Sequence, residues 1–187
     1  MAQIHKLDLY KLCKQIAPQS NLDPLLILAI AQQEAQKDKH DPTIFLGDVG
    51  ALEQGFYRRY IVAMNFATTT EILLSASYGV FQMMGQSLVE TKYFTEEFDD
   101  QDTAYQIRYQ PVMSEENVPK AINRFCVNFP NQVKYSCRHF ITKLRLAKGN
   151  IPRALLLWNG GNDLQYDNKV LTHLAKFNIE VTKGVLK

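Results

Sequence analysis

Apolar residues recur at helical spacing along most of the chain. Near the N-terminus they fall on one face of a helix that we expect over about residues 4–18. Asn21 and Asp23 then offer N-caps, and Pro24 suits a first helical turn. Residues 25–35 follow and are apolar on nearly every side. Because a helix of this kind is normally buried, we expect 25–35 to be the central helix of the fold.

The middle of the chain mixes helical patterns with turn signals. Prolines and glycines punctuate residues 41–55, which predicts turns and a small hairpin. Helical spacing returns over 56–66 and 70–76, and a further helix, opened by a glycine, is expected over 79–91. Residues 93–113 are acidic and aromatic without a clear period, so we expect an irregular insertion there.

The last third of the chain predicts only helices. Ser-Glu-Glu at 114–116 caps a helix that runs toward Phe129, and further helices are expected over 131–148, 151–158 and 166–177. The predicted fold class is therefore mainly α, with at most a small β element.

Length and composition are those of one globular domain over residues 1–187. Hydrophobic residues make up 46% and charged residues 21%, and the net charge of +2 is too small to indicate nucleic acid as a partner. No apolar run is long enough to span a membrane, and the N-terminus lacks the apolar stretch of a secretory signal. We therefore expect a protein made in the cytoplasm that depends on another factor for any delivery outside it.

No metal or cofactor is expected from the residue spacing. The histidines are scattered along the chain, at His5, His40, His139 and His173. The three cysteines also lack metal-ligand spacing and are expected to be buried reduced thiols. An alternative is that Cys126 and Cys137 face each other across neighbouring helices.

Glu34 is the first residue with a chemical role to consider. It lies at the C-terminal end of the apolar helix predicted over 25–35. Burial disfavours the charged form of a carboxyl group, so we expect the pKa of Glu34 to be raised, as a general acid at neutral pH requires. The alternative is an exposed glutamate that closes the helix.

Two further segments combine glycines with amide and aromatic side chains. In the first, Gly79 lets the backbone approach a ligand and Gln82 offers both an amide donor and an acceptor to a sugar. In the second, Trp158 precedes Asn159 and Gly160, a mixture that can line a carbohydrate groove. The alternatives are a packed core segment and a glycine cap at a helix end.

These three segments, in this order, resemble the catalytic domain of lysozyme-like soluble lytic transglycosylases and phage-type N-acetylmuramidases. "ILAIAQQEA" resembles the catalytic-glutamate helix, and "ASYGVFQMMG" resembles the glycine-hydrophobic-hydrophobic-glutamine segment. "LLLWNGGN" followed by "YDNKVL" resembles the Tyr-Asn-Gly element and the closing helix. "ALEQGFYRRY" is similar to the Phe-Glu-x-x-x-Phe stretch of the muramidases. The resemblance covers about residues 22–177.

The resemblance implies an α+β lysozyme-like fold, with a helical bundle around a central helix, a small hairpin or loop lobe and a substrate cleft. It implies cleavage of the MurNAc-β-1,4-GlcNAc bond of peptidoglycan, with Glu34 as the catalytic acid. If the enzyme is a hydrolase, Glu53 is our candidate for the second acidic residue and Asp48 is the next choice. We favour a transglycosylase. The residues that the resemblance places on the substrate are Ser77, Tyr78, Gly79, Gln82, Trp158, Asn159, Gly160 and Tyr166.

Two departures from the family pattern motivate an alternative. Ala35 stands where a serine usually follows the glutamate, and Trp158 stands where a tyrosine is usual. A wall-cleaving domain without a secretion signal suggests a phage product, either an endolysin or a virion-associated enzyme. The alternative is an inactive lysozyme-like structural protein of a virion, in contact with other virion proteins.

A third hypothesis is a nucleic-acid-binding helical domain. Its motive is a set of basic residues that recur along one predicted helix, Lys134, Arg138, Lys143, Arg145 and Lys148. Such a run is more often a solvated helix face, so nucleic acid is not an expected partner.

Overall fold

A computed structural model describes residues 2–47, 50–52, 68–97, 105–107, 110–112, 117–161 and 163–187, and this part of the chain is mostly helical. The helices are α1 (Lys6–Ile16), η1 (Ala17–Ser20), α2 (Pro24–Glu34), α4 (Thr68–Ser75), α5 (Gly85–Glu90), α6 (Tyr93–Glu97), α7 (Val118–Val127), α8 (Phe129–Leu146), α9 (Ile151–Trp158) and α10 (Tyr166–Thr182). The strands are β1 (Gln3–His5), β2 (Ile44–Leu46), β3 (Gly50–Leu52), β4 (Ala76–Tyr78), β5 (Met83–Met84), β6 (Tyr105–Ile107) and β7 (Gln110–Val112).

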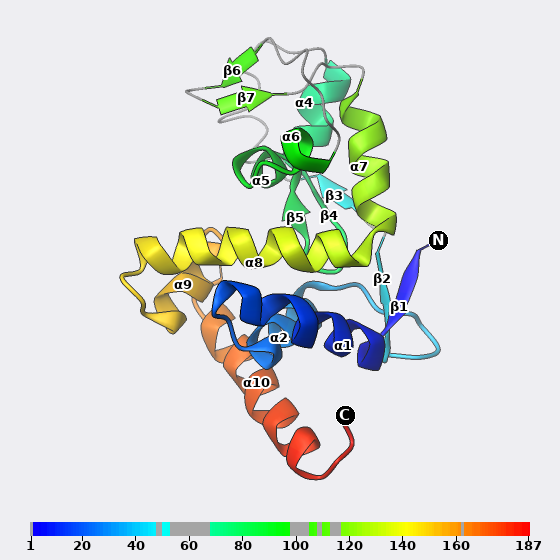
Figure 1. Ribbon diagram of the computed structural model, residues 1–187, viewed down its shortest axis with the longest axis vertical. Helices are drawn as coiled ribbons and strands as arrows, with labels where there is room; N and C mark the ends of the chain where they lie inside the picture. The colour runs from blue at the N-terminus through cyan, green and yellow to red at the C-terminus, as the bar shows by residue number, and fades with distance from the viewer. Residues whose placement is uncertain are drawn as a thin grey trace.

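Helix α8 runs across the molecule and separates two groups of elements (Figure 1). On one side lie α1, α2, α9 and α10, with α10 extending away from the rest of the fold. On the other side lie the antiparallel sheet β3-β4-β5, helices α4 to α7 and the hairpin β6-β7. The mainly α class with a small β element is therefore confirmed.

The central position predicted for the apolar helix is confirmed by α2. Every residue from Leu25 to Ala31 is buried, and α2 packs against α1, α8 and α10. Its start is fixed by Asp23, whose carboxylate accepts a hydrogen bond of 2.8 Å from the Leu25 N–H, and by Pro24 in the first turn. Asn21 does not cap α2; it ends η1 in the left-handed conformation, with φ 54°.

The predicted opening helix is shorter than expected at its N-terminus. Residues 3–5 form β1, which pairs antiparallel with β2, and α1 begins only at Lys6. The side chain of His5 accepts a hydrogen bond of 3.2 Å from the Leu7 N–H and caps the helix. Pairing with a strand some 40 residues away overrides the local helical pattern here.

The prediction of a helix over 79–91 is wrong for its first half. Residues 79–82 form the turn of the β4-β5 hairpin, and the helix begins only at Gly85. The prediction of an irregular 93–113 is also wrong in part, because α6, β6 and β7 lie within it. The helix predicted over 56–66 and the cap at 114–116 lie outside the described residues.

The C-terminal helices follow the sequence pattern closely. Helix α9 has the predicted bounds and α10 begins at the predicted Tyr166, although it continues to Thr182. The three cysteines are buried thiols, as expected. In the described part of the chain, no helix has the length and apolarity needed to cross a membrane.

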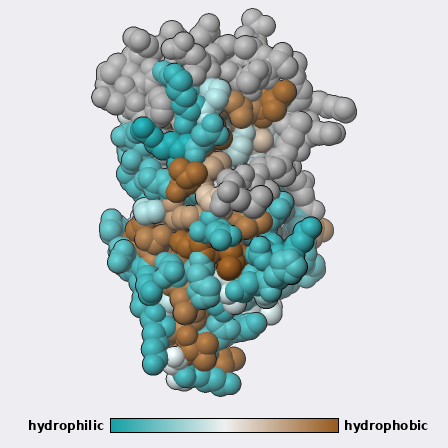
Figure 2. All heavy atoms as spheres, turned by 90° about the vertical axis from the view of Figure 1, so that its right-hand side faces the viewer, coloured by the Kyte–Doolittle hydropathy of each residue, from teal (hydrophilic) through white to brown (hydrophobic). Residues whose placement is uncertain are grey.

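Apolar side chains also reach the surface. The face in Figure 2 carries them across its middle and toward the end of the molecule that α10 forms. Exposed aliphatic residues at the end of α10 and just beyond it are Ile179, Val181 and Val185. Leu186, the residue after Val185, is by contrast almost fully buried.

Candidate functional site

Glu34 is the last residue of α2, at the end of the most buried helix. The helix stops because Ala35 takes an extended backbone, with φ −64° and ψ 136°. Lys37 folds back over this end, and its Nζ donates to the carbonyl oxygens of Gln32 at 2.8 Å and Ala35 at 3.3 Å. These bonds satisfy carbonyls that a helix end leaves without partners. The side chain of Glu34 itself is half-buried.

Tyr166 contacts Glu34 directly. Its hydroxyl donates a hydrogen bond of 2.5 Å to Glu34 Oε1, although the two residues lie 132 positions apart in the sequence. Tyr166 is only 2% exposed, and burial together with the nearby Glu34 carboxylate raises the pKa of Tyr166 well above its ordinary value. The hydroxyl therefore stays protonated and remains a hydrogen-bond donor at any working pH.

The turn before α10 holds Tyr166 in place. The Asn159 Oδ1 accepts a hydrogen bond of 2.8 Å from the Asp163 N–H. Asp163 in turn accepts from the Gln165 N–H at 3.0 Å and forms an ion pair of 2.6 Å with Lys169. Because these bonds connect the end of α9 to the first turn of α10, they fix the position from which Tyr166 reaches Glu34.

Ser77, Tyr78, Gly79 and Gln82 lie together on the β4-β5 hairpin. The Gln82 Nε2 donates to the Gly79 carbonyl at 2.8 Å, and the Ser77 Oγ donates to the Gln82 Oε1 at 3.1 Å. The Tyr78 hydroxyl donates to the carbonyl of Leu73 at 3.0 Å. The sequence predicted that a helix would carry Gln82, and this prediction is wrong. Gln82 lies in the hairpin turn instead, and its half-buried amide forms hydrogen bonds within that turn.

Gly79 approaches another part of the protein. A Cβ at this position would lie 2.4 Å from the Oε1 of Gln132, and the backbone φ of 76° is in the region that glycine favours. The same Oε1 accepts a hydrogen bond of 2.8 Å from the Val80 N–H. The close backbone approach expected at Gly79 is therefore made to Gln132 of α8.

Gln132 is a residue that the sequence analysis missed. It is fully buried on α8, and its Nε2 donates to the carbonyl oxygens of Cys126 at 2.9 Å and Phe125 at 3.1 Å. One side chain thus joins the hairpin turn, through Val80, to the junction of α7 and α8. Its signal in the sequence is a polar amide on the face of α8 that also carries Val133 and Ser136, both buried.

Trp158 packs against α8. Its ring centroid lies 5.1 Å from that of His139, with an edge-to-face angle of 68°, and 6.2 Å from that of Phe140. His139 is 7% exposed, and burial, followed by the charge of Lys143, lowers the pKa of His139 to about 3. The half-buried Trp158 therefore packs against the ring side chains of α8.

Asn159 and Gly160 terminate α9. The Asn159 N–H bonds to the carbonyl of Leu155 at 3.2 Å, and Gly160 and Gly161 have φ of 73° and 78°. The Gly161 N–H returns to the carbonyl of Leu156 at 2.9 Å, which closes the helix end. The cap that the sequence analysis kept as an alternative is present here, and Asn159 belongs to it.

The described site thus consists of three local groups, around Glu34, Gln82 and Trp158. Glu34 and Tyr166 are joined by a hydrogen bond, and Asn159 is joined to the turn that carries Tyr166. Glu53 and Asp48 lie outside the described residues. Within the described residues, no three His, Cys, Asp or Glu side chains are close enough together to hold a metal ion.

Comparison of the chain with protein-family models, curated proteins and solved structures found no match in any of the three. Any assignment of function therefore rests on the residues of this chain and on their geometry.

Proposed function

We propose that this protein is a lysozyme-like glycosidase that cleaves the MurNAc-β-1,4-GlcNAc bond of peptidoglycan, with Glu34 as the general acid. The proposal joins the order of the three sequence segments to one structural observation, the hydrogen bond from Tyr166 to Glu34. That bond supports the proposal because a proton donor in catalysis must be held in one orientation toward its substrate.

The environment of Glu34 holds its carboxyl group in one orientation. The buried hydroxyl of Tyr166 fixes the rotation of the carboxyl group by donating to Oε1, which directs the acidic proton to Oε2. The helix that carries Glu34 is itself packed in the core, since every residue from Leu25 to Ala31 is buried. A glutamate that merely closed a helix would not need a buried partner from the other end of the chain.

The proposed reaction begins with proton transfer from Glu34 to the glycosidic oxygen. The bond between that oxygen and C1 of the muramic residue then breaks, with oxocarbenium character at C1. We favour a transglycosylase, in which the Glu34 carboxylate next accepts the proton of the muramic 6-hydroxyl while this oxygen attacks C1. The product carries a 1,6-anhydro end, and Glu34 is protonated again.

Hydrolysis with a second carboxylate is the alternative chemistry. A retaining or inverting hydrolase needs a second acidic residue as nucleophile or base, and Glu53 is the residue that we propose for it. In either case Gln82 and Asn159 are proposed to orient the sugar substituents. The packing of Trp158 against His139 is the observation that favours a third possibility, a fold that keeps its shape without catalysis.

The test is mass spectrometry of muropeptides released from purified cell walls. Wild type is expected to release products with 1,6-anhydro ends, lighter by one water than the reducing ends that a hydrolase leaves. Glu34→Gln should lower release by roughly a hundredfold or more, since the amide cannot donate the proton. Asp8→Asn, which changes an exposed carboxylate on α1, is the matched control and should retain full activity.

The outcomes separate the alternatives. Reducing-end products from wild type contradict the transglycosylase and support hydrolysis. Release that is unchanged in Glu34→Gln removes Glu34 from the mechanism. If wild type releases nothing from walls of several chemotypes, the protein is not a glycosidase of this class.

A further inference from the structure

Positive charge is concentrated in one stretch of the chain. Residues 117–162, which include α7, α8 and α9, contain eight of the 21 cationic residues and none of the 19 acidic ones. The rest of the chain therefore carries more acidic than cationic residues, and the net charge of +2 hides a strong asymmetry. Asymmetry of this kind favours contact with an anionic partner through one part of the surface.

The first cations of α8 are not available to such a partner. Lys134 Nζ lies 2.5 Å from Glu97 Oε1, and an Arg138 guanidinium nitrogen lies 2.6 Å from Glu96 Oε2. The Tyr135 hydroxyl also donates to Glu97, at 2.9 Å. These bonds attach α6 to α8, so two of the five residues behind the nucleic-acid hypothesis are neutralised within the protein.

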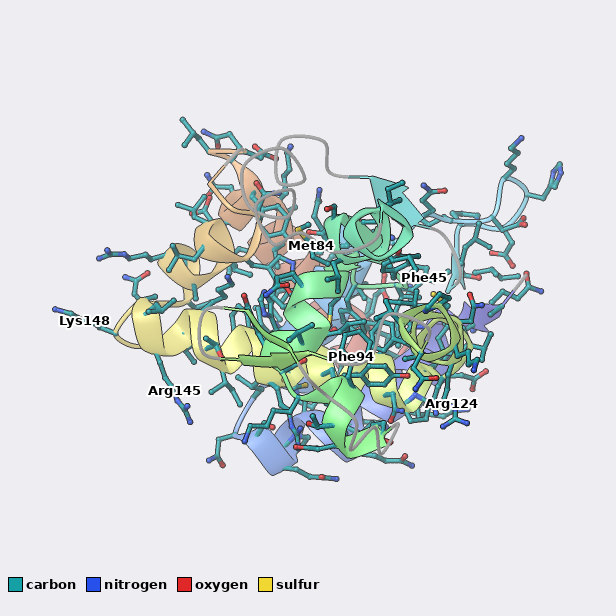
Figure 3. All side chains as sticks on the ribbon, turned by 90° about the horizontal axis from the view of Figure 1, so that it is seen from above. Phe45, Met84, Phe94, Arg124, Arg145 and Lys148 are labelled. Carbon is teal, nitrogen blue, oxygen red and sulfur yellow. The ribbon has the colours of Figure 1, made fainter. Side chains whose placement is uncertain are left out.

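Three further cations lie where α8 turns into α9. We call residues 145–153 the α8–α9 tip. Arg145, Lys148 and Arg153 are all exposed, and in the part of the chain that the structure describes none of them forms an ion pair. Figure 3 shows Arg145 and Lys148 pointing outward from the end of α8. The tip is therefore a patch of uncompensated positive charge.

Aliphatic side chains lie between these cations. Leu146 is 62% exposed and Ile151 is 39% exposed, and Pro152 beside Ile151 is exposed as well. Bilayer interfaces accept both kinds of group, so aliphatic side chains set between unpaired cations match such a surface. The basic groups can bind anionic headgroups while the aliphatic groups enter the acyl boundary.

The backbone of the tip is held rigidly. The Gly149 N–H bonds to the carbonyl of Leu144 at 2.9 Å, and the Lys148 N–H bonds to that of Arg145 at 3.0 Å. Asn150 caps α9 by accepting from the Arg153 N–H at 2.9 Å. A Cβ at Gly149 would meet nothing within 4 Å, so the turn is open to its surroundings. A turn whose backbone is already fixed lowers the cost of ordering the chain on binding.

We propose that the α8–α9 tip docks on a bilayer that contains anionic phospholipid. Arg145, Lys148 and Arg153 bind the headgroups, and Leu146 and Ile151 insert at the interface. A nucleic acid would use the same cations but has no place for the two aliphatic side chains. The proposal goes beyond the glycosidase function and does not depend on it, because docking and cleavage use different residues.

The experiment measures binding of the full chain to sedimented vesicles of phosphatidylcholine, with and without phosphatidylglycerol. Wild type is expected to bind only the vesicles with phosphatidylglycerol, and more weakly as salt is raised. The triple variant Arg145→Gln, Lys148→Gln, Arg153→Gln should bind on the order of a hundredfold more weakly, at about fivefold for each cation. Leu146→Ser with Ile151→Ser should weaken binding roughly tenfold while the charge is unchanged.

A triple variant with the same loss of charge is the control. Lys39→Gln, Lys120→Gln and Lys176→Gln remove exposed cations outside the tip and should leave binding nearly unchanged. If this control loses as much affinity as the tip variant, net charge and not the tip is responsible, and the proposal is wrong. It is equally wrong if wild type fails to bind the anionic vesicles. Insensitivity to the two serine substitutions, with equal binding to duplex DNA, identifies a nucleic-acid surface instead. Circular dichroism of each variant establishes that it is folded.

Discussion

The hydroxyl of Tyr166, in the first turn of α10, donates a hydrogen bond to Oε1 of Glu34, in the last turn of α2. The contact joins the most buried helix of the protein to the helix that closes the chain. Tyr166 is buried and its hydroxyl stays protonated, and Glu34 is half-buried at a helix end. This pair is where the proposed chemistry can be tested most directly.

Tyr166→Phe should lower the catalytic rate by roughly ten- to a hundredfold, since it removes the donor that orients Glu34 and keeps the ring. The free energy of unfolding should fall by about 1 kcal/mol, the usual value of one hydrogen bond. A donor to the ionised carboxylate favours that form, so the limb of the pH–rate profile that reports the acid should move to higher pH. A variant with wild-type kinetics and an unchanged profile would show that the pair is only structural.

The burial of His139 should make the free energy of unfolding fall in acid. Its unfolded pKa is about 6.5, whereas burial holds the folded pKa of His139 at about 3. The unfolded chain therefore takes up the proton first, so the stabilisation is complete above about pH 6.5 and is lost as pH falls toward 3. Between pH 7 and pH 4 the free energy of unfolding should fall by ~3 kcal/mol from this group.

The measurement is urea unfolding followed through Trp158, the one tryptophan of the chain, which contacts the His139 ring. His139→Gln should flatten the dependence on pH between 7 and 4. His40→Gln, at an exposed position, is the matched control and should keep the wild-type slope. Equal slopes in all three proteins would contradict the assignment to His139.

Local signals were enough to predict several elements of the fold. The all-round apolar pattern of 25–35 placed α2 at the centre, and the helix predicted over 151–158 has the observed bounds of α9. The sequence also placed Glu34 at the end of the central helix. In each case the information lies within one helix and its caps, which is where propensity and periodicity apply.

Long-range contacts decided the parts that the sequence did not predict. Gly79 and Gln82 have positive φ, and the N–H of Val80 bonds to Gln132, which is 52 residues away. Nothing in the local pattern of 76–91 indicates that the side-chain amide of Gln132 on α8 will accept this hydrogen bond. The pairing of β1 with β2 and the role of Tyr166 as a partner of Glu34 were missed for the same reason.

Gln132→Leu should be among the most destabilising changes in the described core. It removes the acceptor of the Val80 N–H and the donor to the carbonyls of Phe125 and Cys126. The Phe125 carbonyl keeps a hydrogen bond from the Asn128 N–H, so the loss falls on the Val80 N–H and the Cys126 carbonyl. At about 1–3 kcal/mol for each of these two groups, a loss of roughly 2–6 kcal/mol is expected in urea unfolding. Gln15→Leu, an exposed position on α1, should change stability by less than about 0.5 kcal/mol. A loss that is no greater in Gln132→Leu than in this control would contradict the role of Gln132.

Alanine variants of Asn159 and Gln82 distinguish a residue that caps a helix from one that contacts substrate. Asn159→Ala removes the acceptor of the Asp163 N–H and should lower the free energy of unfolding by about 1 kcal/mol. Gln82→Ala should lower kcat/KM by roughly five- to a hundredfold, because a sugar substituent loses its partner, and should leave the pH profile unchanged because an amide does not titrate. Gln15→Ala, which removes an exposed amide on α1, is the matched control and should change neither Tm nor kcat/KM. If Gln82 serves only its hairpin, Gln82→Ala should lower Tm and leave kcat/KM unchanged. A loss of kcat/KM in Gln82→Ala that Gln15→Ala does not share is the result that a substrate contact requires.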